Sequence, residues 1–323
     1  MPDSAAIICT RNRPEALRQT LASVAEQDLP SPPNVLVVDA SDSRSLSANQ
    51  KAVDDFSPLV EHIEYDGTPS AARQRNMGLC HLPDATDVVF FLDDDITLRP
   101  GCLRHLASAL YSSPFPGGVG ALEVPNKDQS ASSVPSRSPF WKYLFLLDHP
   151  RPGRVLPSGR ISSYSSPFRI YDDEPFSTEW LSTCCCAYKT SVLDEIQFDD
   201  SLWGALLEDL DLSYRVSKSS LLITVPESKF VHHRSPRNRR SVYQYAHDRL
   251  VQRYWFVDKN VDSPFAKPAF WWGTLGQLIA SLLSPKENEK WEALRGRLNG
   301  IREILFQSHP LLRSETDSPT ASI

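Results

Sequence analysis

The stretch from Val88 to Asp95 constrains the fold of this 323-residue chain more than any other. It reads Val-Val-Phe-Phe-Leu-Asp-Asp-Asp, five apolar residues followed by three acids. An unbroken run of β-branched and aromatic residues is typical of a strand buried on both faces, as in a parallel sheet flanked by helices. Such sheets bind ligands at the carboxyl ends of their strands, so Asp93 and Asp95 are placed to hold a divalent cation through oxygen ligands. The acids could instead cap a helix that begins near Pro100, because carboxylates favour helix N-termini.

The first 124 residues alternate between strand-like and helix-like segments. Short apolar runs predict strands at 5–9, 35–38, 60–65, 88–92 and 117–124. Apolar residues at helical spacing predict helices at 14–24, 70–79 and 102–111. Because strands that alternate with helices form mostly parallel sheets, the sequence predicts an α/β fold with a mostly parallel sheet flanked by helices.

Regular periodicity is lost between residues 125 and 179, where Ser, Pro and Arg accumulate. A loop of this length inside a domain is usually functional or disordered. Beyond it, the pattern predicts a helix at 208–216, a strand at 221–225 and a further extended run at 230–233.

The composition is that of an ordinary globular protein, with 41% hydrophobic and 23% charged residues. A formal net charge of -6 argues against a protein that binds nucleic acid. The six cysteines, three of them consecutive at 184–186, lack the spacing of a zinc site, so we interpret them as reduced core residues of a cytoplasmic protein. We see no basic and apolar leader, and no apolar run approaches the roughly 18 residues of a membrane-spanning helix.

Five short blocks occur in a characteristic order along the chain. With them, the chain resembles the family-2 glycosyltransferases of the GT-A (nucleotide-diphospho-sugar transferase) fold over roughly residues 5–257. The segment Tyr243 to Lys259 is also similar to the helix that follows the catalytic core in rhamnosyl-type members. The sequence departs from the family pattern at Ala40, where an acid is common, and at Ile196-Gln197, where Gly-Gly is usual. The blocks are Thr10-Arg11-Asn12-Arg13-Pro14, Val37-Val38-Asp39, Arg75-Asn76-Met77-Gly78, Leu92-Asp93-Asp94-Asp95 and Glu208-Asp209-Leu210-Asp211-Leu212.

The resemblance implies an inverting transfer of a sugar from a nucleotide-diphosphate sugar to an acceptor hydroxyl, in polysaccharide or envelope glycan synthesis. The resemblance also favours UDP or dTDP sugars as donors, and a glycan or a lipid-linked sugar as acceptor. The implied catalytic domain covers residues 1–233, with nucleotide-sugar binding at about 1–124 and the acceptor region at about 125–233. Residues 234–312 are then a C-terminal helical extension, and residues 313–323 a disordered tail.

The acids after the central strand match the Asp-x-Asp (DXD) motif of the family. Asp93 and Asp95 would hold Mg or Mn, which as a Lewis acid neutralises the charge that develops on the leaving diphosphate. One of His232 and His233 could complete the metal shell through its imidazole, although histidines of this kind are also common as packed or surface residues.

The resemblance places Asp39 against the nucleobase, with Thr10 and Arg13 near the same pocket. Arg75, and also Arg73, could pair with the diphosphate, although arginines on helices are often merely solvated. The full set expected to bind the nucleotide sugar is Thr10, Arg11, Arg13, Asp39, Arg73, Arg75, Asn76, Asp93 and Asp94.

An inverting transfer needs a base that takes the proton of the acceptor hydroxyl. The family's Glu-Asp motif places this base at Asp209, with Glu208 orienting acceptor or donor and Asp211 on the helix face. The acids could instead compensate the positive end of the helix dipole. We expect Trp180 and Trp203 to contact the acceptor.

Two other classes of protein remain as alternatives. Asp93-Asp94-Asp95-Ile96-Thr97 also fits the Asp-x-Asp-x-Thr pattern of haloacid-dehalogenase-like phosphatases, in which Asp93 would be the nucleophile. Against this, two β-α units precede the motif here, and Ile96 occupies the place of the usual Gly. The second alternative is a non-catalytic relative that only binds a sugar nucleotide or a partner protein.

The C-terminal region contains an apolar stripe at helical spacing. The stripe suits either peripheral membrane contact through 270–283, at the inner face of the membrane, or packing on the catalytic domain or on a second subunit. The absence of a dense basic patch on the polar face favours packing. The stripe consists of Phe270, Trp271, Leu275, Leu278, Ile279 and Leu282, with Trp272 beside it.

Overall fold

The computed structural model describes residues 3–112, 116–125, 140–162, 174–202, 206–234, 240–283 and 287–313. The chain forms two compact units, the first made of residues 1–136 and 164–237 and the second of residues 137–163 and 238–323. The predicted boundary at 233 lies close to this division, but residues 137–163, expected in the acceptor region, belong to the second unit. Except for Arg313, the predicted disordered tail lies outside the described residues.

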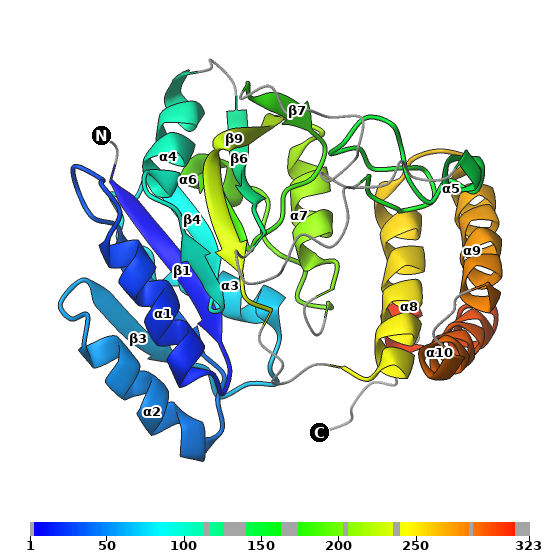
Figure 1. Ribbon diagram of the computed structural model, residues 1–323, viewed down its shortest axis with the longest axis horizontal. Coiled ribbons are helices and arrows are strands. Elements are labelled where there is room, and N and C mark those ends of the chain that lie inside the picture. Colours follow the sequence, from blue (N-terminus) through cyan, green and yellow to red (C-terminus); the bar gives the residue numbers. More distant parts are fainter. Residues whose placement is uncertain are drawn as a thin grey trace, which may run out of the picture. The chain divides into compact units, whose positions relative to one another are not determined.

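Four parallel strands form one half of the sheet in the first unit (Figure 1). They lie in the order β3-β2-β1-β4, which confirms the predicted α/β fold for this half. Thr10 pairs with Asp39, and Cys9 pairs with Asp93, so the carboxyl ends of these strands meet at one edge. The strands are β1 (Ser4–Thr10), β2 (Asn34–Asp39), β3 (Val60–Glu64) and β4 (Val88–Asp93).

The other half of the sheet is mixed rather than parallel. The order continues β8-β6-β9-β5, and β7 also pairs with β9. Among the described strands of this half, β6 and β9 run parallel to each other, whereas β8 is antiparallel to β4 and β6, and β5 and β7 are antiparallel to β9. The two extended runs predicted at 221–225 and 230–233 are one irregular strand, β9. The strands are β5 (Ile96–Leu98), β6 (Pro116–Glu123), β7 (Phe176–Thr178), β8 (Cys185–Lys189) and β9 (Leu221–His232).

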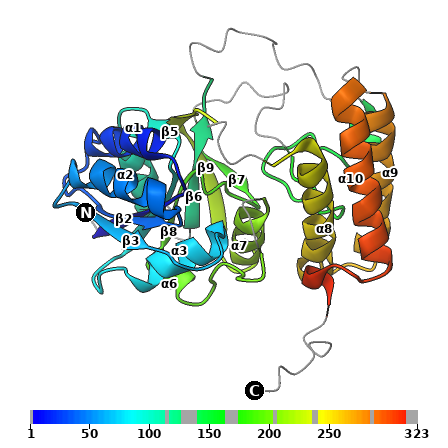
Figure 2. The same cartoon turned by 90° about the horizontal axis from the view of Figure 1, so that it is seen from below.

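Helices cover both faces of this sheet (Figure 2). On one face, α1 (Pro14–Ala25), α2 (Ser43–Asp54) and α4 (Cys102–Ser112) pack their apolar residues against alternate residues of the strands. On the other face lie α3 (Ala71–Cys80), α6 (Thr190–Leu193) and α7 (Glu208–Val216). The sequence pattern does not predict α2, because this helix buries only Asn49, Ala52 and Val53.

The second unit is helical, and its three longest helices lie alongside one another in Figure 2. Gly273 and Gly276 of α9 let Phe145 pack closely against that helix, where its ring stacks on Trp272 with centroids 4.9 Å apart. The short helix α5 was not predicted, since its segment shows no periodicity. Within the described parts of the chain, no helix has both the length and the hydropathy needed to cross a bilayer. The elements are α5 (Phe140–Leu144), α8 (Val242–Asn260), α9 (Ala266–Leu282), α10 (Glu287–Leu305) and the 3₁₀ turn η1 (Pro310–Leu312).

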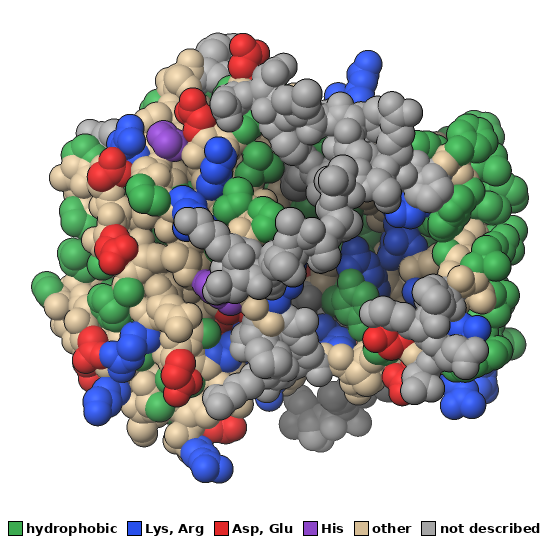
Figure 3. Space-filling model, viewed as in Figure 1, with side chains coloured by type: hydrophobic (Ala, Val, Ile, Leu, Met, Phe, Trp, Pro, Cys, Tyr) green, Lys and Arg blue, Asp and Glu red, His purple; other side chains and the backbone are tan. Residues whose placement is uncertain are grey.

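The apolar stripe expected on α9 divides between two faces. Phe270 is buried and packs edge-on against Tyr254 of α8. A second set of side chains is exposed at the surface of α9, where Figure 3 shows hydrophobic side chains gathered. This exposed set consists of Trp272, Leu275, Ile279 and Leu282.

Candidate active site

The site is built at the edge where the carboxyl ends of β1, β2 and β4 meet. Parallel register brings Thr10, Asp39 and Asp93 to this edge, because the three strands end level with one another. The loop after β4 adds Asp94 and Asp95, and β5 follows immediately. The sequence predicts that this edge of the sheet carries the ligand-binding acids, and the edge is indeed rich in carboxylates.

Asp94 anchors the loop after β4 to the end of β1. The hydroxyl of Thr10 donates to Asp94 Oδ2 at 2.7 Å, and Arg13 Nη1 donates to Asp94 Oδ1 at 2.8 Å. Burial raises the pKa of Asp94 to about 6, although Arg13 and the Thr10 hydroxyl act in the opposite direction. Both carboxylate oxygens of Asp94 are thus used within the protein, which places Thr10 and Arg13 beside the acids.

Asp93 and Asp95 lie beside His232. Ile96 of β5 pairs with His232 of β9, so His232 Nε2 lies 3.0 Å from Asp95 Oδ1. Burial lowers the pKa of His232, but the hydrogen bond to Asp95 and the charge of Asp93 outweigh it and raise this pKa above its usual value. His233 is exposed, and its Nε2 lies 2.7 Å from the hydroxyl of Thr97. Of the two histidines, His232 is therefore the one that faces the acids.

Cys184 joins this group, although we predicted only a core role for it. One ligand atom each from Asp93, Cys184 and His232 lie within 4.8 Å of one another. Burial and the neighbouring Asp93 raise the pKa of the Cys184 thiol well above its usual value, so the thiol is protonated. The amide of Asp93 donates to the Cys184 carbonyl at 3.1 Å where β8 approaches β4. This long-range strand pairing leaves no local signal in the sequence.

Arg75 connects α3 to two acids of the site. Its Nη1 donates to Glu208 Oε1 at 2.9 Å, and its Nη2 lies 3.3 Å from Asp93 Oδ1. The guanidinium also lies over the ring of Phe198, 5.5 Å from its centroid. Arg75 and Glu208 are each only 5% exposed at the side chain, whereas Asp93 is 27% exposed. Asp93 is accordingly the carboxylate of this group that remains open to a ligand.

Asp209 follows Glu208 in the first turn of α7 and is only partly buried. Burial and the negative charge of Glu208 raise the pKa of Asp209 to about 7, against the opposing effect of Arg75. The next acid of this motif, Asp211, is fully buried and forms an ion pair with Arg215 at 2.7 Å, so it stabilises the helix. Asp209 is therefore a carboxylate that changes protonation near neutral pH.

Asp39 is fully buried at the end of β2. Its carboxylate accepts hydrogen bonds from the amide of Ser41 at 2.9 Å and from Asn49 Nδ2 at 2.9 Å, and His62 Nε2 lies 3.0 Å away. Burial opposes ionisation, but these three partners outweigh it and lower the pKa of Asp39. Asp39 thus organises the loop after β2, and a nucleobase would meet the side chains around it before the carboxylate itself.

The other predicted nucleotide-sugar residues lie around this core. Arg73 Nε donates to the carbonyl of Asp200 at 3.0 Å, and Asn76 Nδ2 donates to Asp200 Oδ1 at 2.7 Å. These two residues of α3 therefore hold the segment before α7 rather than facing Asp93. Arg11 is exposed just after β1.

The structure describes one of the two tryptophans that we expected to contact the acceptor. Trp180 is 8% exposed, so little of its ring is open to a sugar. Trp203 lies outside the described residues.

Three solved structures share this fold over most of the chain. GalNAc-T7, in a structure with UDP, GalNAc and Mn2+, gives a TM-score of 0.62 at 14% identity, over 96% of this chain and 59% of that one. The mannosyltransferase PcManGT from Pyrobaculum calidifontis, with GDP-Man and Mn2+, gives 0.55 at 16% identity, over 96% and 90% of the two chains. S. aureus TarS 1-349 gives 0.53 at 15% identity, over 94% and 82%. No curated protein matches the sequence.

Sheet order, flanking helices and these likenesses define a GT-A fold. The sequence from residue 5 to residue 196 matches the model of glycosyl transferase family 2, which is more than half of the chain. The chain belongs to this family, and the predicted family and fold are confirmed.

Proposed function

We propose that this chain is an inverting glycosyltransferase that moves a sugar from a nucleotide-diphosphate sugar to an acceptor hydroxyl. The observation that carries the proposal is the carboxylate of Asp209, whose pKa is raised to about 7 at the start of α7. A general base works best when its pKa lies near the working pH. Glu208 is held by Arg75 at 2.9 Å and would orient the substrate, which leaves Asp209 to take the acceptor proton.

The acids beside His232 fit a divalent cation. The side chains of Asp93 and Asp95 and the imidazole of His232 supply the oxygen and nitrogen donors that Mg or Mn accept. When bound, such a cation supplies Lewis-acid stabilisation of the leaving diphosphate. The raised pKa of His232 agrees with a site of excess negative charge, and the GalNAc-T7 and PcManGT structures both contain Mn2+.

The donor would lie along the ends of β1 and β2. Arg13 is 22% exposed at its side chain and lies 3.6 Å from Asp95, so it is placed to share a diphosphate with the cation. The loop held by Asp39 would border the nucleobase. We propose a UDP or dTDP sugar as the donor; the GalNAc-T7 structure contains UDP, and the PcManGT structure contains GDP-Man.

We propose a glycan or lipid-linked sugar as acceptor, with the enzyme in the cytoplasm at the inner face of the membrane. The exposed apolar side chains of α9 support peripheral contact through 270–283. The solved structures are under 25% identical and share only the fold, so this acceptor class follows from the family resemblance.

The alternatives are less well supported. In the phosphatases the nucleophile follows the first strand of the core, whereas Asp93 follows β4, and the chain belongs to a glycosyltransferase family. A non-catalytic relative would have no need for a titratable carboxylate beside Arg75.

A donor screen tests the proposal directly. We expect one nucleotide sugar in a panel to release nucleoside diphosphate in the presence of Mn and an acceptor, with little release when EDTA replaces Mn. Proton NMR of the product should show the anomeric configuration opposite to that of the donor. Retained configuration would contradict the inverting mechanism, and phosphate release without acceptor would favour the phosphatase.

A further inference from the structure

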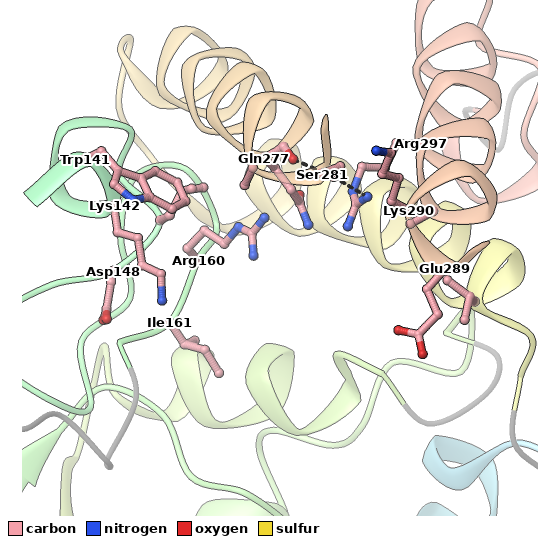
Figure 4. A pocket seen from close by; sticks show the side chains of 14 residues that line it. Trp141, Lys142, Asp148, Arg160, Ile161, Gln277, Ser281, Glu289, Lys290 and Arg297 are labelled. Carbon is pink, nitrogen blue, oxygen red and sulfur yellow. Dashed lines mark hydrogen bonds between the residues drawn. The ribbon is translucent and has the colours of Figure 1, made fainter. Parts of the chain in front are cut away.

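A pocket in the second unit gathers positive charge. The cavity of about 500 Å³ is lined by the 141–161 segment, α8, α9 and α10 (Figure 4). Its lining carries four cations and two acids, so positive charge is in excess by two. These residues are Lys142, Arg160, Lys290, Arg297, Asp148 and Glu289.

The backbone around Arg160 is shaped to bring this residue against α8. The amide of Leu156 donates to the carbonyl of Arg160 at 2.7 Å and closes a tight turn. Gly159 in this turn has a φ of 72°, and a Cβ atom there would lie 2.8 Å from Cγ of Arg253. Because only glycine fits readily here, the turn can approach α8 and place Arg160 next to Arg253.

The two arginines that line this pocket, and Arg253 next to them, are only partly satisfied by neutral groups. Arg253 is 3% exposed and donates to Gln277 Oε1 at 3.3 Å, and Arg297 donates to Ser281 Oγ at 2.7 Å. Figure 4 shows Arg160, Gln277 and Arg297 directing their side chains into the same space. Arg160 Nη2 and Arg297 Nε are buried without a hydrogen-bond partner. Among the described residues, no carboxylate forms an ion pair with Arg160, Arg253 or Arg297.

Gathering these cations is electrostatically unfavourable. Burial, together with the positive charges of Arg249 and Arg297, lowers the pKa of Arg160 to about 9. Burial and the charge of Arg160 likewise lower the pKa of Arg253 well below its usual value. Arg160 therefore remains charged at neutral pH, and buried charges without counter-charges cost free energy. An anion in the pocket would offset this cost and occupy the unused donors.

We propose that this pocket binds the phosphate group of a phosphate monoester or diphosphate. Arg160 of the turn and Arg297 of α10 direct their donors into it, and a phosphate offers three terminal oxygens where a carboxylate offers two. A phosphate monoester carries about -1.5 to -2 charges, which matches the excess of two positive charges in the lining. Trp141, Leu147 and Ile161 supply an apolar wall for the organic part of the ester. The site lies wholly in the second unit, goes beyond the proposed transferase function and does not depend on it.

Binding is tested on the full chain by thermal shift and calorimetry in EDTA, with inorganic phosphate, pyrophosphate and glucose 1-phosphate as soluble probes. Co-sedimentation with phosphatidate vesicles, compared with phosphatidylcholine vesicles, tests a lipid headgroup as the source. The pocket variants are Arg160→Gln and Arg297→Gln. The matched control is Arg295→Gln, which changes an exposed arginine of the same helix α10.

We expect a soluble probe or the phosphatidate vesicles to bind the wild type and the control, with an affinity loss of about tenfold or more in both pocket variants. Because the variants remove uncompensated charge, their unfolding temperature without ligand should equal or exceed that of the wild type. Soluble probes alone would identify a free phosphate ester, and vesicles alone a lipid headgroup. If neither the soluble probes nor the phosphatidate vesicles bind, or if the pocket variants bind as well as the wild type, the proposal is overturned.

A labelling experiment on the wild type covers the case in which a variant fails to fold. Phenylglyoxal modifies accessible arginines, and peptide mass spectrometry reports the extent at each position. The bound probe should protect Arg160 and Arg297 while Arg295 continues to react. Equal labelling with and without the probe would exclude the site, whatever the variants show.

Discussion

Arg75 donates a hydrogen bond of 2.9 Å to Glu208, a residue 133 positions later in the sequence. The pair is buried and links α3 to α7 across one face of the sheet. Glu208 uses its other oxygen to accept from the amide of Leu206 at 2.8 Å. Burial and the charge of Glu208, which is held in this way, together raise the pKa of the neighbouring Asp209. One ion pair thus fixes the start of α7 and contributes to the charge around the proposed base.

Replacing Arg75 by Met should strongly destabilise the first unit. The change leaves Glu208 buried without its counter-charge, and breaking a buried pair in this way typically costs about 3–5 kcal/mol. Urea unfolding should therefore show a lower midpoint for Arg75→Met. Arg73→Met on the same helix removes an exposed contact to a carbonyl and should stay within about 0.5 kcal/mol of the wild type. Similar losses in the two variants would show that the buried pair has no special role.

Asp209→Asn should separate catalysis from stability. Asn keeps the shape of the side chain but cannot accept a proton, so we expect kcat to fall by roughly 10²-fold or more with little change in donor affinity. Steady-state kinetics and calorimetry with the donor measure the two effects. Near-wild-type turnover in Asp209→Asn together with loss in Glu208→Gln would place the base at Glu208 instead.

The same variant has a predicted pH dependence of stability. The pKa of Asp209 is raised from 3.8 to about 7 in the folded protein, so the folded state binds this proton more tightly than the unfolded state. The stabilisation that Asp209 gives the wild type is therefore lost as the pH rises from about 4 to about 7. Above that range, Asp209→Asn should be more stable than the wild type by about 1 kcal/mol or more, and the difference should vanish in acid. An equal difference at all pH values would contradict the raised pKa.

Asp95→Ala should abolish the metal dependence of nucleotide binding. The change removes an anionic ligand beside His232, and oxygen ligands are what Mg or Mn require here. Calorimetry with nucleoside diphosphate, with and without Mn, measures the effect. The control is Asp84→Ala, an exposed acid in the loop before β4. Unchanged metal dependence in Asp95→Ala would assign the acids to a structural role.

His247 should stabilise the second unit only at lower pH. Its hydrogen bond to Asp248 at 2.9 Å and the charge of Glu303 outweigh burial and raise the pKa of His247. A raised folded pKa gives stability that is fully present below the unfolded value of about 6.5 and is lost as pH rises through the folded value. His247→Gln should therefore lower the unfolding temperature at about pH 5.5 and have less effect at about pH 9. His81→Gln changes an exposed histidine of the first unit and serves as the control.

Charging the exposed stripe of α9 tests peripheral membrane contact. Leu275→Glu with Ile279→Glu places two acids among exposed apolar side chains, so folding should be preserved while affinity for an apolar interface falls. Liposome flotation of the wild type and the double variant measures the effect. Equal flotation, or none in either protein, would favour the stripe as a packing surface.

The local sequence was sufficient to predict the strands of the parallel half of the sheet. The apolar runs of β1, β2 and β4 are buried on both faces, so the pattern of each strand identifies it without reference to its neighbours. The acids that follow β2 and β4 could be assigned to one edge, since parallel strands end together. By contrast, α2 buries too few apolar residues to show a helical pattern, and α5 is too short to show one.

Tertiary structure alone decided which residues meet at that edge. The antiparallel pairing of β5 with β9 turns His232 toward Asp95 and leaves His233 exposed, a choice that two adjacent histidines cannot reveal. The approach of β8 to β4 brings Cys184 beside Asp93, and the packing of a glycine turn on α8 gathers Arg160 and Arg253. Strand patterns depend on neighbours in sequence, whereas these contacts depend on register between distant segments, so only the folded chain specifies them.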